Sequence, residues 1–188
     1  MVRKSVIVVF LILNSFIGFS CTTFIIKTAN ELVFGRNLDW YSDDGIIVVN
    51  KRNTKKTSLV FPPEKPVEWT SKYGSITFNQ FGKEFPFGGI NEKGLVVEIM
   101  LSAADYENYD DREAINEFQW IQYQLDNSET IDDVINSNKY LRISPIEEEL
   151  HFLICDATGN SAVIEFHDNS MVVYKDEKLP TTVLENDN

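Results

Sequence analysis

The stretch CTTFIIKTANELVFGRNLDW, residues 21–40, decides how the rest of this chain is interpreted. Its first seven residues are rich in β-branched and aromatic side chains, TANE is typical of a turn, and LVFGRNLDW follows as a return strand. We therefore predict a β-hairpin that begins at a cysteine. Pairing across its turn would bring Arg36 and Asp39 back beside Cys21.

The residues before Cys21 have the three parts of a secretory signal peptide. Arg3 and Lys4 form a short basic start, an apolar run follows, and Gly18 and Ser20 place small residues at positions −3 and −1. The apolar run is shorter than the roughly 18–20 residues that span a bilayer, and no later stretch is apolar enough to do so. We therefore predict a signal peptide over residues 1–20, export to the periplasm or medium, and no membrane span.

The remaining chain is strongly acidic. The leader holds two of the 17 basic residues and none of the 29 acidic ones, so residues 21–188 carry a formal charge of −14 with neutral histidines. This charge argues against nucleic acid and anionic membranes as partners, because both attract clusters of Lys and Arg. The length suits one domain with its own core, and two cysteines are too few for a disulfide-built scaffold.

The element order is strands, then helices, then strands. Strand-like runs occupy residues 45–50, 58–61 and 73–82, and GGINEKG predicts a turn that leads into the strand LVVEIML. Residues 114–125 show helical spacing of apolar side chains, and TIDD, residues 130–133, predicts a second helix that starts with a capping box. LHFLICD, SAVIEF and MVVYK predict a final β-meander. This segregated order favours an α+β sandwich over alternating βαβ units.

Cys21 allows three interpretations. It is a lipid attachment point, although the lipid-processing signal usually has Leu at −3 and a small residue at −2, where this chain has Gly18 and Phe19. It forms a disulfide with Cys155, which export permits, although Cys155 lies in an apolar, strand-like run. In the third interpretation, cleavage makes Cys21 the amino terminus, so that its thiol passes a proton to its own α-amine.

The third interpretation needs supporting groups, and the hairpin supplies two. A cation near sulfur favours the thiolate, and Arg36 is placed for that role. An anion beside the α-amine would hold the amine in position, and Asp39 is placed for this second role. A free α-amine titrates at about 7.7–8.0, so a fraction is neutral and able to act as a base near pH 7.

Taken together, CTTF, GRNLDW, GGINEKGL, INEFQWIQYQLD and LHFLICDATGNSAVIEF resemble the choloylglycine hydrolase family, and the resemblance covers residues 21–188. This family contains bile salt hydrolases and penicillin V acylases, which are N-terminal-nucleophile (Ntn) amidases. The resemblance implies an Ntn-hydrolase αββα sandwich that hydrolyses linear carbon–nitrogen bonds of small-molecule acyl amides, without a metal or other cofactor. It also admits a homo-oligomer, because tetramers are common among relatives.

Carried over by position, the resemblance assigns five roles. Cys21 is the nucleophile and provides the base, Arg36 is the cation beside the thiol, and Asp39 is the ligand of the α-amine. The oxyanion hole falls on the side chain of Asn186 in VLENDN and on the backbone N–H of Leu101 in LVVEIML.

Two departures concern this site. Leu101 stands where bile salt hydrolases typically carry Asn and penicillin V acylases Tyr, so it keeps the backbone donor without a side-chain hydrogen bond. Glu185 precedes Asn186 where threonine is usual. Trp40, beside the predicted amine ligand, is the tryptophan we expect to contact a substrate.

Length is a third departure. Family members are about twice as long as residues 21–188, which therefore correspond to their N-terminal half. Half of a sandwich would leave the apolar face of one sheet uncovered. The alternative function is accordingly a catalytically inactive, truncated or lipid-anchored exported α+β module.

The two histidines and Glu98 are further candidates for chemistry. His151 and His167 belong to no HExxH or paired CxxC pattern, so we predict no metal site. Glu98 interrupts the apolar run LVVEIML. If it is buried, it needs a cationic partner such as Arg112 or Arg142, and otherwise it faces the pocket.

Overall fold

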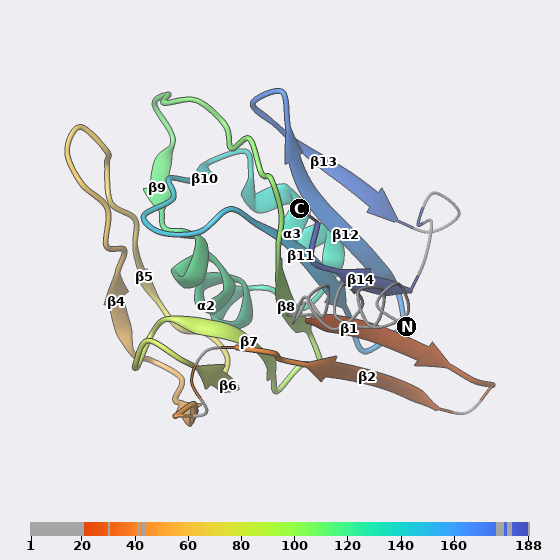
Figure 1. Cartoon of the computed structure of the whole chain (residues 1–188). Helices are drawn as coiled ribbons and strands as arrows, with labels where there is room; N and C mark the ends of the chain where they lie inside the picture. The colour runs from red at the N-terminus through yellow and green to blue at the C-terminus, as the bar shows by residue number, and fades with distance from the viewer. Residues whose placement is uncertain are drawn as a thin grey trace, which may run out of the picture.

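The structure is a computed structural model, and it describes residues 21–29, 31–40, 42, 44–175, 179 and 182–187. The predicted signal peptide lies outside the described residues. From Cys21 onwards the described chain combines a seven-stranded sheet, a three-stranded sheet and helices α2 and α3 (Figure 1). The predicted α+β class is therefore confirmed.

The larger sheet is antiparallel, in the order β13-β12-β11-β8-β7-β6-β3. Its β11, β12 and β13 are the predicted meander, which lies next to β8. The strands span β3 (Ile46–Asn50), β6 (Ser75–Asn79), β7 (Pro86–Asn91), β8 (Val96–Leu101), β11 (Leu150–Cys155), β12 (Ser161–His167) and β13 (Ser170–Lys175).

The smaller sheet contains the predicted hairpin. β1 (Thr22–Lys27) and β2 (Leu32–Asn37) pair antiparallel, with Thr23 opposite Arg36. The other edge of β1 pairs with β14 (Val183–Glu185), so that the two ends of the described chain meet in one sheet.

Alternating side chains of β11 divide the core in two. Phe152 and Ile154 join the large cluster that packs against α2, whereas Leu153 and Cys155 join a smaller cluster that includes Cys21 on the hairpin side. All of β11 is buried, as expected for an apolar strand covered on both faces. Because each such side chain contributes about 1.5–3 kcal/mol on burial, both covering layers stabilise this strand.

Helix α2 (Glu117–Asn127) begins later than its apolar spacing predicts. Its N-cap is Asn116, whose side chain accepts a hydrogen bond from the backbone N–H of Gln119 at 2.9 Å. The preceding residues belong to β9 (Glu113–Ile115), which pairs in parallel with β10 (Leu141–Ile143). The apolar side chains before the cap are compatible with a helix or a strand. Pairing with β10, which is distant in sequence, selects the strand.

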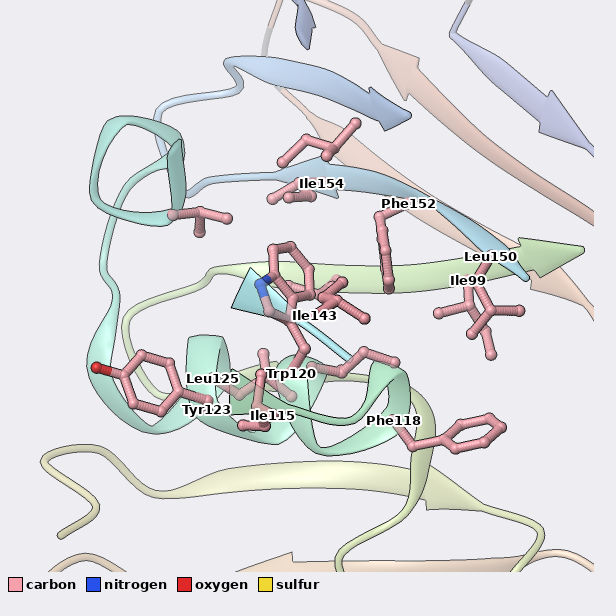
Figure 2. Packing of buried hydrophobic residues seen from close by; sticks show 14 of the residues in the cluster. Ile99, Ile115, Phe118, Trp120, Tyr123, Leu125, Ile143, Leu150, Phe152 and Ile154 are labelled. Atoms are coloured by element: carbon pink, nitrogen blue, oxygen red, sulfur yellow. The ribbon is translucent and has the colours of Figure 1, made fainter. Parts of the chain in front are cut away.

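Helix α2 is buried on all sides rather than along one stripe. Every residue from Glu117 to Asp126 is buried. Trp120 packs against Phe152 of the sheet with ring centroids 4.5 Å apart, as Figure 2 illustrates. On the other side, Tyr123 meets Trp69 of the β4–β5 hairpin at 5.5 Å. This hairpin, β4 (Lys55–Thr57) and β5 (Glu68–Thr70), covers the helix face that a surface helix would expose.

Two short segments differ from the sequence predictions. Residues 58–61 are not a strand, because β4 ends at Thr57 and the hydroxyl of Ser58 bonds the carbonyl of Ala114 at 2.7 Å. In GGINEKG, residues 88–91 belong to β7, so the turn is confined to the residues after Asn91.

Both helices are short. Helix α3 (Ile131–Ser137) starts with the predicted capping box, in which Thr130 and Asp133 bond each other's backbone N–H groups. In the described part of the chain, no helix has the length and apolar character needed to cross a bilayer.

Among the described residues, one half of the large sheet is left exposed on its hairpin side. On β3, β6 and β7 the residues that face this side are exposed and apolar, and they are neighbours across the strands: Ile47 beside Phe78, and Ile76 beside Val49 and Ile90. Val49 is 70% exposed. The smaller sheet covers the other half. That residues 21–188 correspond to half of a sandwich stays a prediction.

Prediction for the α2 layer: replacing Asp126 with Ala costs about 3–5 kcal/mol of unfolding free energy. Its buried carboxylate accepts hydrogen bonds from Lys56 Nζ at 2.8 Å and Trp69 Nε1 at 2.7 Å, so the change leaves a buried, unpaired ammonium. Urea unfolding measures the change. Lys65→Ala, which removes the exposed 3.7 Å pair with Glu113, is the control and costs about 0–1 kcal/mol. Equal effects of the two variants would contradict this account.

Candidate active site

Cys21 lies directly before β1 and is buried, with 5% of its surface exposed. Its Sγ donates a hydrogen bond to the backbone carbonyl of Asp39 at 3.4 Å. The contact follows from the hairpin register, in which Thr22 lies opposite Asn37, so that the residues just after β2 return to the cysteine. The structure therefore brings the Asp39 backbone to the thiol.

Arg36 is held in the interior by two acceptors. Its Nη1 donates to the carbonyl of Phe87 on β7 and to Oε2 of Glu98 on β8, each at 2.7 Å. The guanidinium carbon lies 5.9 Å from the centre of the Phe87 ring. The Arg36 and Glu98 side chains are only 13% and 6% exposed, so this ion pair is weakly screened by solvent.

The expected partner of Glu98 is corrected by this pair. Glu98 is buried, but its partner is Arg36 of the hairpin rather than Arg112 or Arg142, both of which pair with other carboxylates. The charged residue inside an apolar run indicated a buried ion pair. The partner of Glu98 lies on another sheet, and only the packing of the two sheets identifies this partner.

Burial dominates the titration of Glu98. Desolvation of the carboxylate raises the pKa of Glu98 from its usual 4.5 to about 7, although the charge and hydrogen bond of Arg36 act in the opposite direction. Near neutral pH this carboxyl therefore exists in both its protonated and its ionised form.

Five of the six predicted site residues border one small cavity of about 20 Å³, which has room for about one water molecule. They come from separate segments of the chain: Cys21, Arg36, Trp40, Leu101 and Asn186. The sixth, Asp39, reaches Cys21 through its carbonyl. The cavity is too small for an acyl amide, so a substrate would require it to open.

The two residues predicted for the oxyanion hole touch each other. The backbone N–H of Leu101 donates to Oδ1 of Asn186 at 3.2 Å, and the N–H of Asp187 donates to the Leu101 carbonyl at 2.9 Å. Because Thr22 pairs with Glu185 in the antiparallel β1–β14 ladder, Asn186 lies beside Cys21 at the start of β1. The groups are adjacent, but in this arrangement the Leu101 N–H is bonded to Asn186.

Trp40 forms part of the apolar wall of the cavity. Its ring meets Phe87 edge-on, with centroids 5.3 Å apart, and Phe81 at 6.3 Å. This packing fixes the ring where it borders the same cavity as Cys21.

Each histidine has a hydrogen-bond partner. His151 Nε2 lies 2.9 Å from the carbonyl of Glu185 and so holds β14 against β11, while His167 pairs with Glu165 at 2.8 Å. Burial lowers the pKa of His151. Across the described ranges, no group of three or more His, Cys, Asp or Glu side chains is arranged to hold a metal ion. The absence of a cofactor stays a prediction.

The second cysteine differs from the first. Cys155 and Cys21 both carry free thiols, so they do not form the disulfide considered above. Burial raises the pKa of the Cys155 thiol to about 11, and its Sγ donates to the Asp156 carbonyl at 3.6 Å. It behaves as a small apolar residue of the core.

Comparison with known proteins gives a consistent result. The sequence profile described as "Linear amide C-N hydrolases, choloylglycine hydrolase family" matches residues 21–188. A penicillin V acylase of Pectobacterium atrosepticum is 28% identical over 193 residues, which cover 87% of this chain and 49% of the relative. A bile salt hydrolase/transferase of Clostridium perfringens is 29% identical over 161 residues, covering 77% of this chain and 47% of the relative.

Solved structures show the same likeness. The penicillin V acylase of Agrobacterium tumefaciens superposes with a TM-score of 0.74 at 28% identity, over 89% of this chain and 52% of that one. A variant of the conjugated bile acid hydrolase from Clostridium perfringens gives 0.73 at 25% identity, over 89% and 54%. These likenesses confirm the predicted Ntn-hydrolase fold. The chain spans about half the length of the relatives it matches.

Prediction for the buried carboxyl: the folded chain loses stability as pH rises through the titration of Glu98. The folded state binds this proton more tightly than the unfolded chain, so the stabilisation is complete below about pH 4.5 and is lost as pH approaches 7. The difference between the two pKa values corresponds to about 3 kcal/mol.

Urea unfolding of wild type and of Glu98→Gln at pH 4.5 and 7.5 measures this change. The Gln side chain does not titrate, so the unfolding free energy of wild type should fall by about 3 kcal/mol relative to the variant over this range. A difference between the two proteins that is independent of pH would contradict the prediction.

Proposed function

Because this chain belongs to the choloylglycine hydrolase family of linear amide C–N hydrolases, we propose that it carries the nucleophile of an exported hydrolase of N-acyl amides. The nucleophile is Cys21, exposed as an amino terminus when the leader is removed. Since the chain spans about half the length of its matched relatives, both the activity and the substrate are part of this proposal.

The observation that supports the proposal best is the composition of the small cavity. Cys21 before β1, Trp40 after β2, Leu101 at the end of β8 and Asn186 after β14 are far apart in sequence and border one space. A thiol, a buried cation, a backbone donor and a side-chain amide are the groups that cysteine-dependent acyl transfer requires.

The chemistry would proceed in two balanced steps. The Cys21 thiol gives its proton to its own α-amine, and the thiolate attacks the carbonyl carbon of the amide. The tetrahedral oxyanion accepts hydrogen bonds from the Leu101 N–H and the Asn186 amide. Its collapse breaks the carbon–nitrogen bond, the leaving amine takes the proton from the α-ammonium group, and a thioester remains. Water then releases the acid and restores the thiol.

Two changes must precede this reaction. The cavity of about 20 Å³ has to open to admit an acyl group. The Leu101 N–H also has to exchange the side-chain oxygen of Asn186 for the substrate oxygen. The two residues are already adjacent, so a rotation of the Asn186 side chain would free the Leu101 N–H and turn the Asn186 NH2 group toward the same substrate oxygen.

Processing at Cys21 would couple export to activation. The basic, apolar and small-residue parts of residues 1–20 support cleavage directly before the cysteine. The α-amine exists only after that cleavage, so the base for the reaction would appear together with the mature protein.

The substrate class follows from the relatives and the cavity wall. Matched relatives are a penicillin V acylase and a bile salt hydrolase/transferase. The wall carries the aromatic side chains of Trp40, Phe87 and Phe118. An acyl group with a substantial apolar part fits this wall, and penicillin V and conjugated bile salts are the first compounds to test.

Prediction for the nucleophile: the mature chain that starts at Cys21 hydrolyses at least one of these amides, and Cys21→Ala lowers the rate by at least about a thousandfold. Adding one alanine before Cys21 should have a comparable effect, because it moves the amine away from the thiol. Release of the acid is followed by chromatography, and the acyl-enzyme by intact mass.

Cys155→Ser is the matched control and should retain activity. Hydrolysis that persists without Cys21, or a lipid-blocked Cys21 in the exported protein, would rule the mechanism out. The inactive or lipid-anchored module would then be the better description.

A further inference from the structure

Arg36 borders two cavities. One is the small cavity that contains Cys21. The other, of about 550 Å³, lies between β2 and the uncovered half of the large sheet, and Glu98 and Cys155 are on its wall. Arg36 therefore borders both the cavity that contains the predicted nucleophile and the cavity that contains a buried carboxyl group.

The Glu98 side chain reaches Arg36 through space that the facing residue, Gly88, leaves open. A Cβ atom at Gly88, the residue opposite Glu98 on β7, would lie 1.9 Å from the Glu98 carboxylate, so a larger residue there would displace this side chain from its present position. The Nη1–Oε2 distance is 2.7 Å. In the described chain, Arg36 Nε is buried without a hydrogen-bond partner. This N–H of the guanidinium can therefore donate to a further acceptor.

Among the described residues, two ionisable side chains border Glu98, one of them cationic. Arg36 of β2 is its cationic neighbour, and the Cys155 thiol of β11 shares the larger cavity. The residues directly opposite Glu98 in the sheet are Gly88 on β7 and Leu153 on β11, which do not titrate. Burial raises the pKa of the Cys155 thiol to about 11, so it stays neutral in the neutral pH range.

We propose that Glu98 is a positioning residue that acts on Cys21 through Arg36: it holds the guanidinium at the cavity wall and shares it as counter-ion with the Cys21 thiolate. This proposal rests on the proposed function, because it assigns Cys21 the role of nucleophile. It adds a residue that the predicted site did not include.

A shared counter-ion makes the two ionisations oppose each other. When Glu98 is protonated, the positive charge of Arg36 favours the Cys21 thiolate without competition. When Glu98 is ionised, the carboxylate offsets that charge, and the thiolate loses part of its stabilisation. Because burial raises the pKa of Glu98 to about 7, the change occurs in the neutral pH range.

The test measures the reactivity of Cys21 without any substrate. The mature chain is alkylated with iodoacetamide from pH 5 to pH 10, and peptide mass spectrometry separates adducts of Cys21 from those of Cys155. Glu98→Gln keeps an acceptor for Arg36 but removes the charge. Its midpoint for Cys21 alkylation should lie about one pH unit below that of wild type. If the chain hydrolyses an amide, the acidic limb of kcat/KM should move in the same direction.

Glu98→Asp provides the matched comparison. It retains the charge but withdraws it by one methylene group, so its midpoint should lie between those of Glu98→Gln and wild type. If Glu98 had only a structural role, the midpoints would follow another order. The nearly isosteric Gln variant would then match wild type, and the shorter Asp side chain would give the defective variant. Circular dichroism establishes which variants are folded, and either folded variant is enough for the test.

A folded Glu98→Gln or Glu98→Asp whose Cys21 midpoint equals that of wild type would overturn the proposal, as would a shift to higher pH. Failure of the proposed function has a different signature, because the Cys21→Ala comparison tests amide hydrolysis independently. A downward midpoint shift in a chain without amidase activity would support the coupling and refute only the assigned reaction.

Discussion

Strands β8 and β11 have to bury apolar side chains on both of their faces, and the candidate site depends on how that is achieved. On one face α2 fills the space, with Trp120 against Phe152. On the other face the β1–β2–β14 sheet packs against Leu153 and Cys155. A lone hairpin is at best marginally stable in water, so the large sheet also stabilises the hairpin that carries Cys21.

The site is located where these two sheets meet. Arg36 reaches from the hairpin to the large sheet and bonds Phe87 and Glu98 there. From the other side Leu101, at the end of β8, bonds Asn186 just after β14. Hydrogen bonds therefore cross between the two sheets at the edge of an otherwise apolar contact. They fix the position of one sheet relative to the other.

Charge–charge interactions are stronger at this junction of the two sheets because it excludes water. An exposed arginine beside a thiol would be screened, whereas the Arg36 side chain is 13% exposed and already shares its charge with a carboxylate. The uncovered apolar face over β3, β6 and β7 continues from this junction beside the larger cavity. An exposed apolar face therefore adjoins the candidate site in the described part of the molecule.

The sequence by itself determined the features that depend on neighbouring residues. The hairpin, the capping box at Thr130, the final meander and the α+β class follow from local periodicity and turn chemistry. The motifs from Cys21 to the meander together indicated the family, which the profile match confirms. Apolar spacing alone placed the start of α2 too early, since β9 forms only because β10 pairs with it. Tertiary structure alone decided that Arg36 is the partner of Glu98 and that the Leu101 N–H donates its hydrogen bond to Oδ1 of Asn186. These pairs join residues on different sheets, and the free energy of burying both faces of β8 and β11, which no single segment contains, brings them together.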